Sequence, residues 1–153
     1  MRHSLKVGLS FGLTSGVITT LGLVVGLYAG THSRLAVLGG IITIAIADAF
    51  SDALGIHISE ESEAIHSSTE IWEATLATFF FKFLVAMSFA APLLLLPVQT
   101  AVTTCIVGGL MLLALLSWYV ARSGKAVLEH LLIAATVILT SQLVGGWVAA
   151  RFG

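Results

Sequence analysis

The sequence predicts an all-α membrane protein with five transmembrane helices. Of its 153 residues, 58% are hydrophobic and only 10% are charged, and the mean hydropathy is +1.04. These values lie far from those of ordinary soluble domains. Five apolar segments, residues 7–29, 35–58, 74–96, 100–121 and 127–150, are each long enough to cross about 30 Å of hydrocarbon. We therefore expect a single transmembrane domain over residues 1–153, without a soluble module.

The first span, residues 7–29, is rich in glycine. Small residues four apart allow close approach of helix backbones, so we expect a tight helix contact, either within the chain or with a second copy in a homodimer. The span also carries Ser15 and Thr19. Hydroxyls in membrane helices usually bond to backbone carbonyls of their own helix, and a ligand role is the alternative. The glycines at this spacing are Gly8, Gly12, Gly16, Gly22, Gly26 and Gly30.

The second span, residues 35–58, contains Asp48 and Asp52 inside an apolar run. Because they are four residues apart, both carboxylates can face one cavity, with Ser51 on the same helix. An ionisable group at the centre of a membrane helix costs about 2.5–3.5 kcal/mol on insertion scales. Desolvation favours the protonated acid, whereas an arriving divalent cation favours the carboxylate. The pair therefore predicts a path for an ion or a proton.

The acidic segment of residues 59–73 follows the second span. We expect the second helix to continue to about Ile65, and Ser67 with Glu70 to form a capping box for the third helix. Candidate metal ligands occur here at helical spacings. Binding of a metal and simple solvation of an acidic segment both remain open for them. They are His57, Glu60, Glu63, His66, Glu70 and Glu73.

The third span carries Lys82 at a depth similar to that of Asp48. Lys82 can neutralise Asp48 in an ion pair, or it can extend its ammonium group towards the membrane surface. Asp52 has no equally matched partner, so a cation or proton role is favoured for Asp52.

Basic residues indicate the orientation of the chain. The excess of basic residues on one side places the amino end and residues 59–73 in the cytoplasm and the carboxyl end outside. The net charge of −1 and the absence of a basic cluster give no reason to expect nucleic-acid binding. The basic residues are Arg2, Lys6, Arg122 and Lys125 on the predicted cytoplasmic side, and Arg34 and Arg151 on the other.

Three stretches of sequence carry a family resemblance. Residues 11–26 read FGLTSGVITTLGLVVG, residues 47–55 read ADAFSDALG, and the exit over residues 58–63 reads ISEESE. With weaker similarity over most of the remaining chain, the protein resembles the vacuolar iron transporter family of Fe²⁺ and Mn²⁺ transporters with five membrane helices. The resemblance implies a homodimer with a metal path between the subunits, lined by the first two helices. It also implies an acidic cytoplasmic collecting region and proton-coupled export of divalent metal.

The chain departs from the family pattern at three positions. Ser15 stands where the first-span motif usually has Asp, Asp52 stands where the second-span motif usually has Met, and Ile56 replaces a frequent Glu. Oxygen ligands in place of sulfur suit harder ions. The substitutions therefore favour Mn²⁺ or another hard divalent ion over Fe²⁺.

The leading interpretation is a metal and proton exchanger that needs no resident cofactor. The alternatives are a proton or cation channel, or a membrane scaffold that keeps the fold without transport. An intramembrane aspartyl hydrolase needs two aspartates that face each other across a substrate, usually from different helices, so we expect no enzyme. Because the sequence shows no long organellar targeting peptide, a prokaryotic plasma membrane is the simplest expected location.

Overall fold

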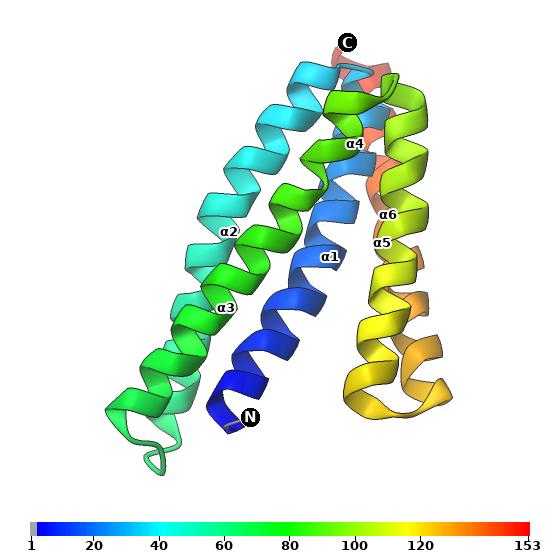
Figure 1. Ribbon diagram of the computed structural model, residues 1–153. Coiled ribbons are helices and arrows are strands. Elements are labelled where there is room, and N and C mark those ends of the chain that lie inside the picture. Colours follow the sequence, from blue (N-terminus) through cyan, green and yellow to red (C-terminus); the bar gives the residue numbers. More distant parts are fainter. Residues whose placement is uncertain (1–2) are drawn as a thin grey trace.

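The computed structural model describes residues 3–153, and these residues form an all-helical bundle (Figure 1). Five helical segments are long and apolar enough to span a membrane. The prediction of a polytopic membrane protein is therefore confirmed at this level. The helices are α1 (His3–Thr31), α2 (Arg34–Ser62), α3 (Ser68–Ser88), α4 (Ala90–Leu95), α5 (Val98–Ala121) and α6 (Gly124–Phe152).

Helix α1 is the central helix of the bundle. It lies between the α2–α3 hairpin and the α5–α6 hairpin, and it contacts all four of these helices (Figure 1). Apolar side chains of α1 such as Val17, Leu21 and Val24 are fully buried. They pack with buried residues of the other helices, including Ile41 and Leu113, into one core cluster. The packing of the whole chain therefore depends on how closely the other helices approach α1.

The glycines of α1 provide that close approach within the chain. A Cβ atom at Gly12 would lie 2.7 Å from the carbonyl oxygen of Thr78 on α3, and one at Gly22 would lie 2.7 Å from a methyl carbon of Val137 on α6. Gly8 and Gly16 also face α3, and Gly26 and Gly30 face α6. Of the two alternatives for this glycine pattern, packing inside the chain is therefore the one observed for the described residues.

Hydropathy predicts one continuous helix for the third span, but the structure divides this span into two helices. Helix α3 ends at Ser88, Phe89 caps it, and the short α4 continues from Ala90. Pro92 explains the break, because it has no N–H to donate to the carbonyl of Ser88, and its ring crowds that carbonyl. The span of residues 74–96 is thus divided near its carboxyl end.

The connection between α2 and α3 differs from the prediction in where α2 ends, and it agrees with the prediction in how α3 is capped. Helix α2 ends at Ser62 instead of about Ile65, and Ala64 follows with a left-handed φ of 55°. The predicted capping box is confirmed: Ser67 N donates to Glu70 Oε2 at 2.9 Å, and Glu70 N donates to Ser67 Oγ at 3.4 Å. This cap fixes where α3 begins.

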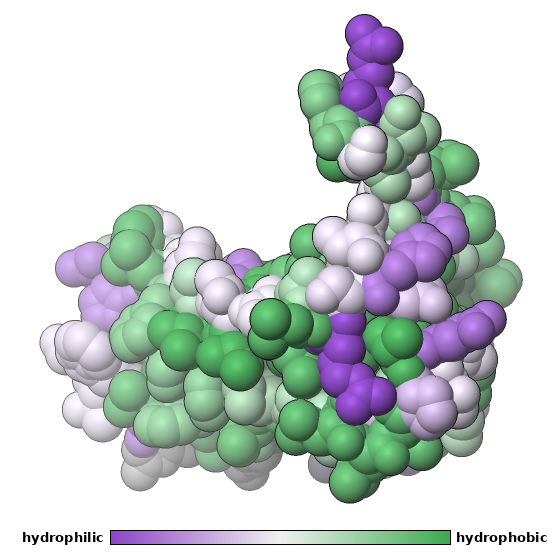
Figure 2. Space-filling view, turned by 90° about the horizontal axis from the view of Figure 1, so that it is seen from above, coloured by the Kyte–Doolittle hydropathy of each residue, from purple (hydrophilic) through white to green (hydrophobic). Residues whose placement is uncertain are grey.

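The two ends of the bundle are distinct. The start of α1 and the α2–α3 and α5–α6 connections lie at one end, and the α1–α2 connection and the carboxyl terminus lie at the other (Figure 1). Seen from this second end, the molecule is mostly hydrophobic, with separate hydrophilic groups and a hollow between two arms (Figure 2). Which end faces the cytoplasm stays a prediction, and Arg2, one of the basic residues behind it, lies outside the described residues.

Candidate functional site

The candidate site is built around a lysine buried between α1, α2 and α3. Lys82 lies on α3, and only 1% of its side chain is exposed. Helix α1 leaves room for it, because a Cβ at Gly16 would lie only 3.3 Å from the carbonyl oxygen of Lys82 and 3.4 Å from its Cγ. A larger residue at Gly16 would press on the lysine, so the glycine pattern of α1 also shapes this site.

The ammonium group of Lys82 contacts both aspartates of α2 and a hydroxyl of α1. Its Nζ lies 2.6 Å from Asp48 Oδ2, forms an ion pair with Asp52 Oδ2, and donates to Ser15 Oγ at 3.0 Å. Ser15 Oγ in turn donates to Asp52 Oδ2 at 2.7 Å. Lys82 Nζ therefore donates two hydrogen bonds, to Asp52 and to Ser15, whereas its contact with Asp48 Oδ2 is an ion pair without hydrogen-bond geometry.

The site is anionic and partly open. When both carboxylates are ionised, the two aspartates and the ammonium group carry a formal net charge of −1. The side chains of Asp48 and Asp52 are 27% and 20% exposed, whereas Lys82 is enclosed. Asp48 Oδ2 itself is shielded, so the exposure of this side chain belongs to its other atoms. Lys82 therefore fills the inner side of the carboxylate pair, and the outer side remains accessible.

The structure brings together three of the residues predicted to line a path, namely Ser15, Asp48 and Asp52. Thr19 lies one turn further along α1 and donates to the backbone carbonyl of Ser15 at 2.9 Å, as membrane hydroxyls usually do. Ser51 is exposed on α2. The expectation that Asp52 lacks a matched partner was wrong, because Lys82 contacts both aspartates.

The other predicted metal ligands do not gather in one place. His66 Nε2 lies 3.5 Å from Glu60 Oε2 and 3.4 Å from Glu63 Oε2, whereas His57 Nδ1 lies 3.0 Å from Thr75 Oγ1 on α3. Among residues 3–153, no group of three or more His, Cys, Asp or Glu side chains is arranged to hold a metal ion.

Two further predicted ligands of the acidic segment have structural contacts. Glu70 belongs to the cap of α3. Glu73 Oε2 accepts a hydrogen bond from the buried Ser4 hydroxyl of α1 at 3.2 Å. These two contacts fix the start of α3, and through Ser4 they join it to the amino-terminal part of α1.

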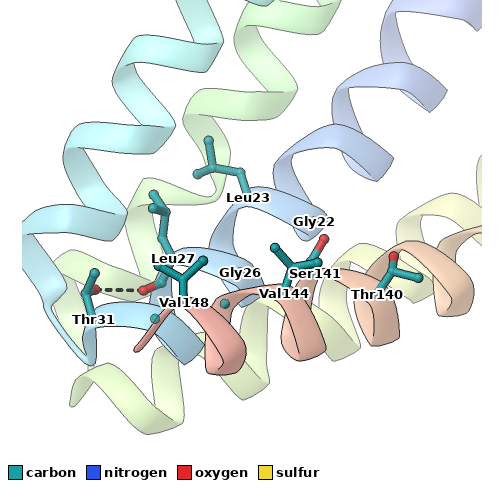
Figure 3. A pocket seen from close by; sticks show the side chains of 11 residues that line it. Gly22, Leu23, Gly26, Leu27, Thr31, Thr140, Ser141, Val144 and Val148 are labelled. Atoms are coloured by element: carbon teal, nitrogen blue, oxygen red, sulfur yellow. Dashed lines mark hydrogen bonds between the residues drawn. The ribbon is translucent and has the colours of Figure 1, made fainter. Parts of the chain in front are cut away.

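Sequence reasoning missed two features of α6. Ser117 on α5 is buried, and its Oγ lies 2.8 Å from His130 Nδ1 on α6, so a polar contact joins the two helices of this hairpin. A groove of about 520 Å³ also follows the α1–α6 contact, with Gly22 and Gly26 on one side and Ser141 and Val144 on the other (Figure 3). Its lining contains no ionisable side chain, and its polar side chains are Thr31, Thr140 and Ser141.

Comparisons with protein-family models, with curated proteins and with solved structures find no match for this chain. What can be inferred about its function therefore comes from its own residues and their geometry.

Proposed function

We propose that this protein is a secondary transporter that exports a divalent metal ion, Fe²⁺ or Mn²⁺, from the cytoplasm in exchange for protons. Asp48 and Asp52 are the oxygen ligands shared by metal and proton. One observation carries the proposal: two partly exposed carboxylates lie together near the middle of a long apolar helix. Ionisable groups at membrane depth are costly and mark transport paths by default.

The chemistry of the donor set supports a hard cation. The oxygens that surround Lys82 Nζ are carboxylate and hydroxyl oxygens from Asp48, Asp52 and Ser15. Oxygen ligands suit Mn²⁺ better than soft ions. A carboxylate that gives up a proton when it takes a metal couples the two fluxes, because the same oxygen rarely holds both. The metal is the transported substrate in this proposal, not a resident cofactor.

We also infer that two copies associate through an edge of α2. Ala47, Ser51 and Gly55 are exposed, lie four residues apart and alternate along α2 with the two aspartates. A Cβ at Gly55 would meet nothing within 4 Å, so another helix can approach this edge closely. A second copy at this position would cover carboxylates that lipid alone would leave partly exposed, which favours α2 over the glycines of α1 as the interface.

Flux measurements in proteoliposomes with an internal pH dye test the transport proposal. We expect Mn²⁺ or Fe²⁺ movement with opposite proton movement for the wild type, and loss of both for Asp52→Asn and Asp48→Asn. Glu61→Gln is the matched control, because Glu61 is an exposed acid at the end of the same helix. Proton leak without metal flux would support a channel instead. Absence of both fluxes in the wild type as well as in the variants would support a scaffold.

Cross-linking tests the interface. In a Cys105→Ala background, Ser51→Cys should form a disulfide-linked dimer in the membrane, whereas Val144→Cys on the exposed face of α6 should not. Equal cross-linking at both positions would contradict an interface at α2.

A further inference from the structure

We propose that Lys82 determines the affinity and charge selectivity of the cation site, acting as a fixed positive charge behind the two carboxylates. The inference rests on the proposed function, and it names a residue that controls the same site. Lys82 is not itself a ligand of the transported ion, because an ammonium group has no lone pair to donate. It acts through Asp48 and Asp52.

Lys82 is held in place by its surroundings. Its side chain is 1% exposed and lies against the backbone of α1 at Gly16. Its Nζ contacts acceptors on two different helices, Ser15 on α1 and the aspartates on α2. Leaving this position would cost the ammonium group all three contacts in an apolar surrounding. A cation that enters the site therefore meets the lysine in place.

A lysine needed only for membrane insertion would cancel the charge of one carboxylate and leave a neutral pair. Here Lys82 contacts both carboxylates, so one negative charge is uncompensated when both are ionised, and both aspartate side chains keep an exposed part. The arrangement thus retains an anionic outer surface beside an enclosed positive charge.

The positive charge of Lys82 lowers the affinity of the site for a divalent ion. A divalent ion that binds the outer carboxylate oxygens meets a net charge of −1 instead of −2. Unit charges about 4 Å apart interact strongly even at an effective dielectric constant of about 20, so removal of the lysine charge should tighten binding of a divalent ion by at least about tenfold. A monovalent ion carries half that charge and should gain less. Lys82 therefore keeps the binding of a divalent ion weak enough for the ion to be released. It also lowers the preference of the site for divalent over monovalent ions.

Equilibrium binding of Mn²⁺ to the purified full chain at one fixed pH tests the proposal, with Na⁺ as the monovalent competitor. We expect Lys82→Met to bind Mn²⁺ at least about tenfold more tightly than the wild type and to be less sensitive to Na⁺. Lys82→Arg is the control, because it keeps the charge and should keep the affinity near that of the wild type.

A second variant keeps the test decisive if Lys82→Met does not fold. Ser15→Asp adds a negative charge while Lys82 remains, and it should also tighten Mn²⁺ binding, whereas the neutral Ser15→Asn should not. The two charge variants are Lys82→Met and Ser15→Asp. Mn²⁺ binding that is unchanged or weaker in both overturns the role of Lys82. If Lys82→Met does not fold, unchanged or weaker binding in Ser15→Asp alone overturns it.

Transport by the wild type, measured in parallel, separates this inference from the proposed function. Mn²⁺ flux in the wild type without tighter binding in the charge variants refutes only the inference about Lys82. No flux in the wild type, with Mn²⁺ binding gained in the charge variants, refutes the transport proposal and supports the role of Lys82. No binding in any form of the protein refutes both.

Discussion

The neighbouring glycines Gly145 and Gly146 of α6 give a matched test of the packing around α1. A Cβ at Gly145 would lie closer than 3.0 Å to the carbonyl oxygen of Gly26 and 3.0 Å from the Cβ of Ala29, whereas a Cβ at Gly146 would meet nothing within 4 Å. Alanine at Gly145 therefore requires α1 and α6 to separate. Alanine at Gly146 adds a methyl group to open space.

The expected difference follows from two effects. Replacing a helical glycine by alanine gains up to about 1 kcal/mol in helix propensity, and this gain is common to both variants. Overpacking a tight contact costs about 1–3 kcal/mol, and this cost applies only to Gly145→Ala because its neighbour is backbone that cannot rotate away. We therefore expect Gly145→Ala to be less stable than Gly146→Ala by about 1–3 kcal/mol.

Unfolding of the two purified variants in the same detergent, followed by loss of helical circular dichroism, measures this difference. Gly146→Ala should unfold at or slightly above the midpoint of the wild type, and Gly145→Ala clearly below it. If the two variants had the same midpoint, α1 and α6 would not be in the backbone contact described above, and the reasoning from glycine spacing to close packing would fail.

Three further predictions concern other contacts of the chain. Ser67→Ala removes the cap of α3 and should cost about 1 kcal/mol, seen as faster hydrogen exchange of the first amides of α3, while exchange in the middle of the helix stays slow. Gly12→Ala would bring a Cβ to 2.7 Å from the carbonyl oxygen of Thr78, so it should move α1 away from α3 and reduce Mn²⁺ flux; full flux would show that the site does not depend on this spacing. Ser117→Ala leaves His130 Nδ1 without its partner on α5, so it should lower the free energy of unfolding by about 1 kcal/mol without changing Mn²⁺ flux. A loss of flux would show that the α5–α6 hairpin takes part in transport.

Much of the fold follows from the sequence because each span is an apolar segment of the length that a bilayer requires. The cap of α3 was predictable for a similar reason, since a serine and a glutamate three residues apart satisfy the first amides of a helix locally. The break at Phe89 was not predicted, because hydropathy does not register the amide that Pro92 lacks. Which helices the α1 glycines pack against was not predictable either, because small residues allow close approach of any neighbouring helix.

The candidate site was less predictable than the fold. Spacing along α2 is enough to place Asp48 and Asp52 together, and depth along α3 is enough to bring Lys82 to their level. Spacing does not reveal that one ammonium group contacts both carboxylates and the Ser15 hydroxyl, because that depends on how closely α1 and α3 approach. Hydrogen bonds within each helix are local and can be read from the sequence, whereas contacts between three helices depend on their packing.

The hydrogen bond between Ser15 and Asp52 joins α1 to α2 at the candidate site. The Ser15 hydroxyl donates to Asp52 Oδ2 at 2.7 Å, and Lys82 Nζ contacts both groups, so one carboxylate is held at the junction of α1 and α2. A third carboxylate at Ser15 would lie against Asp52 and would raise the negative charge that Lys82 has to balance. The serine therefore fits a site in which one lysine faces two aspartates, and the variant Ser15→Asp tests this balance directly.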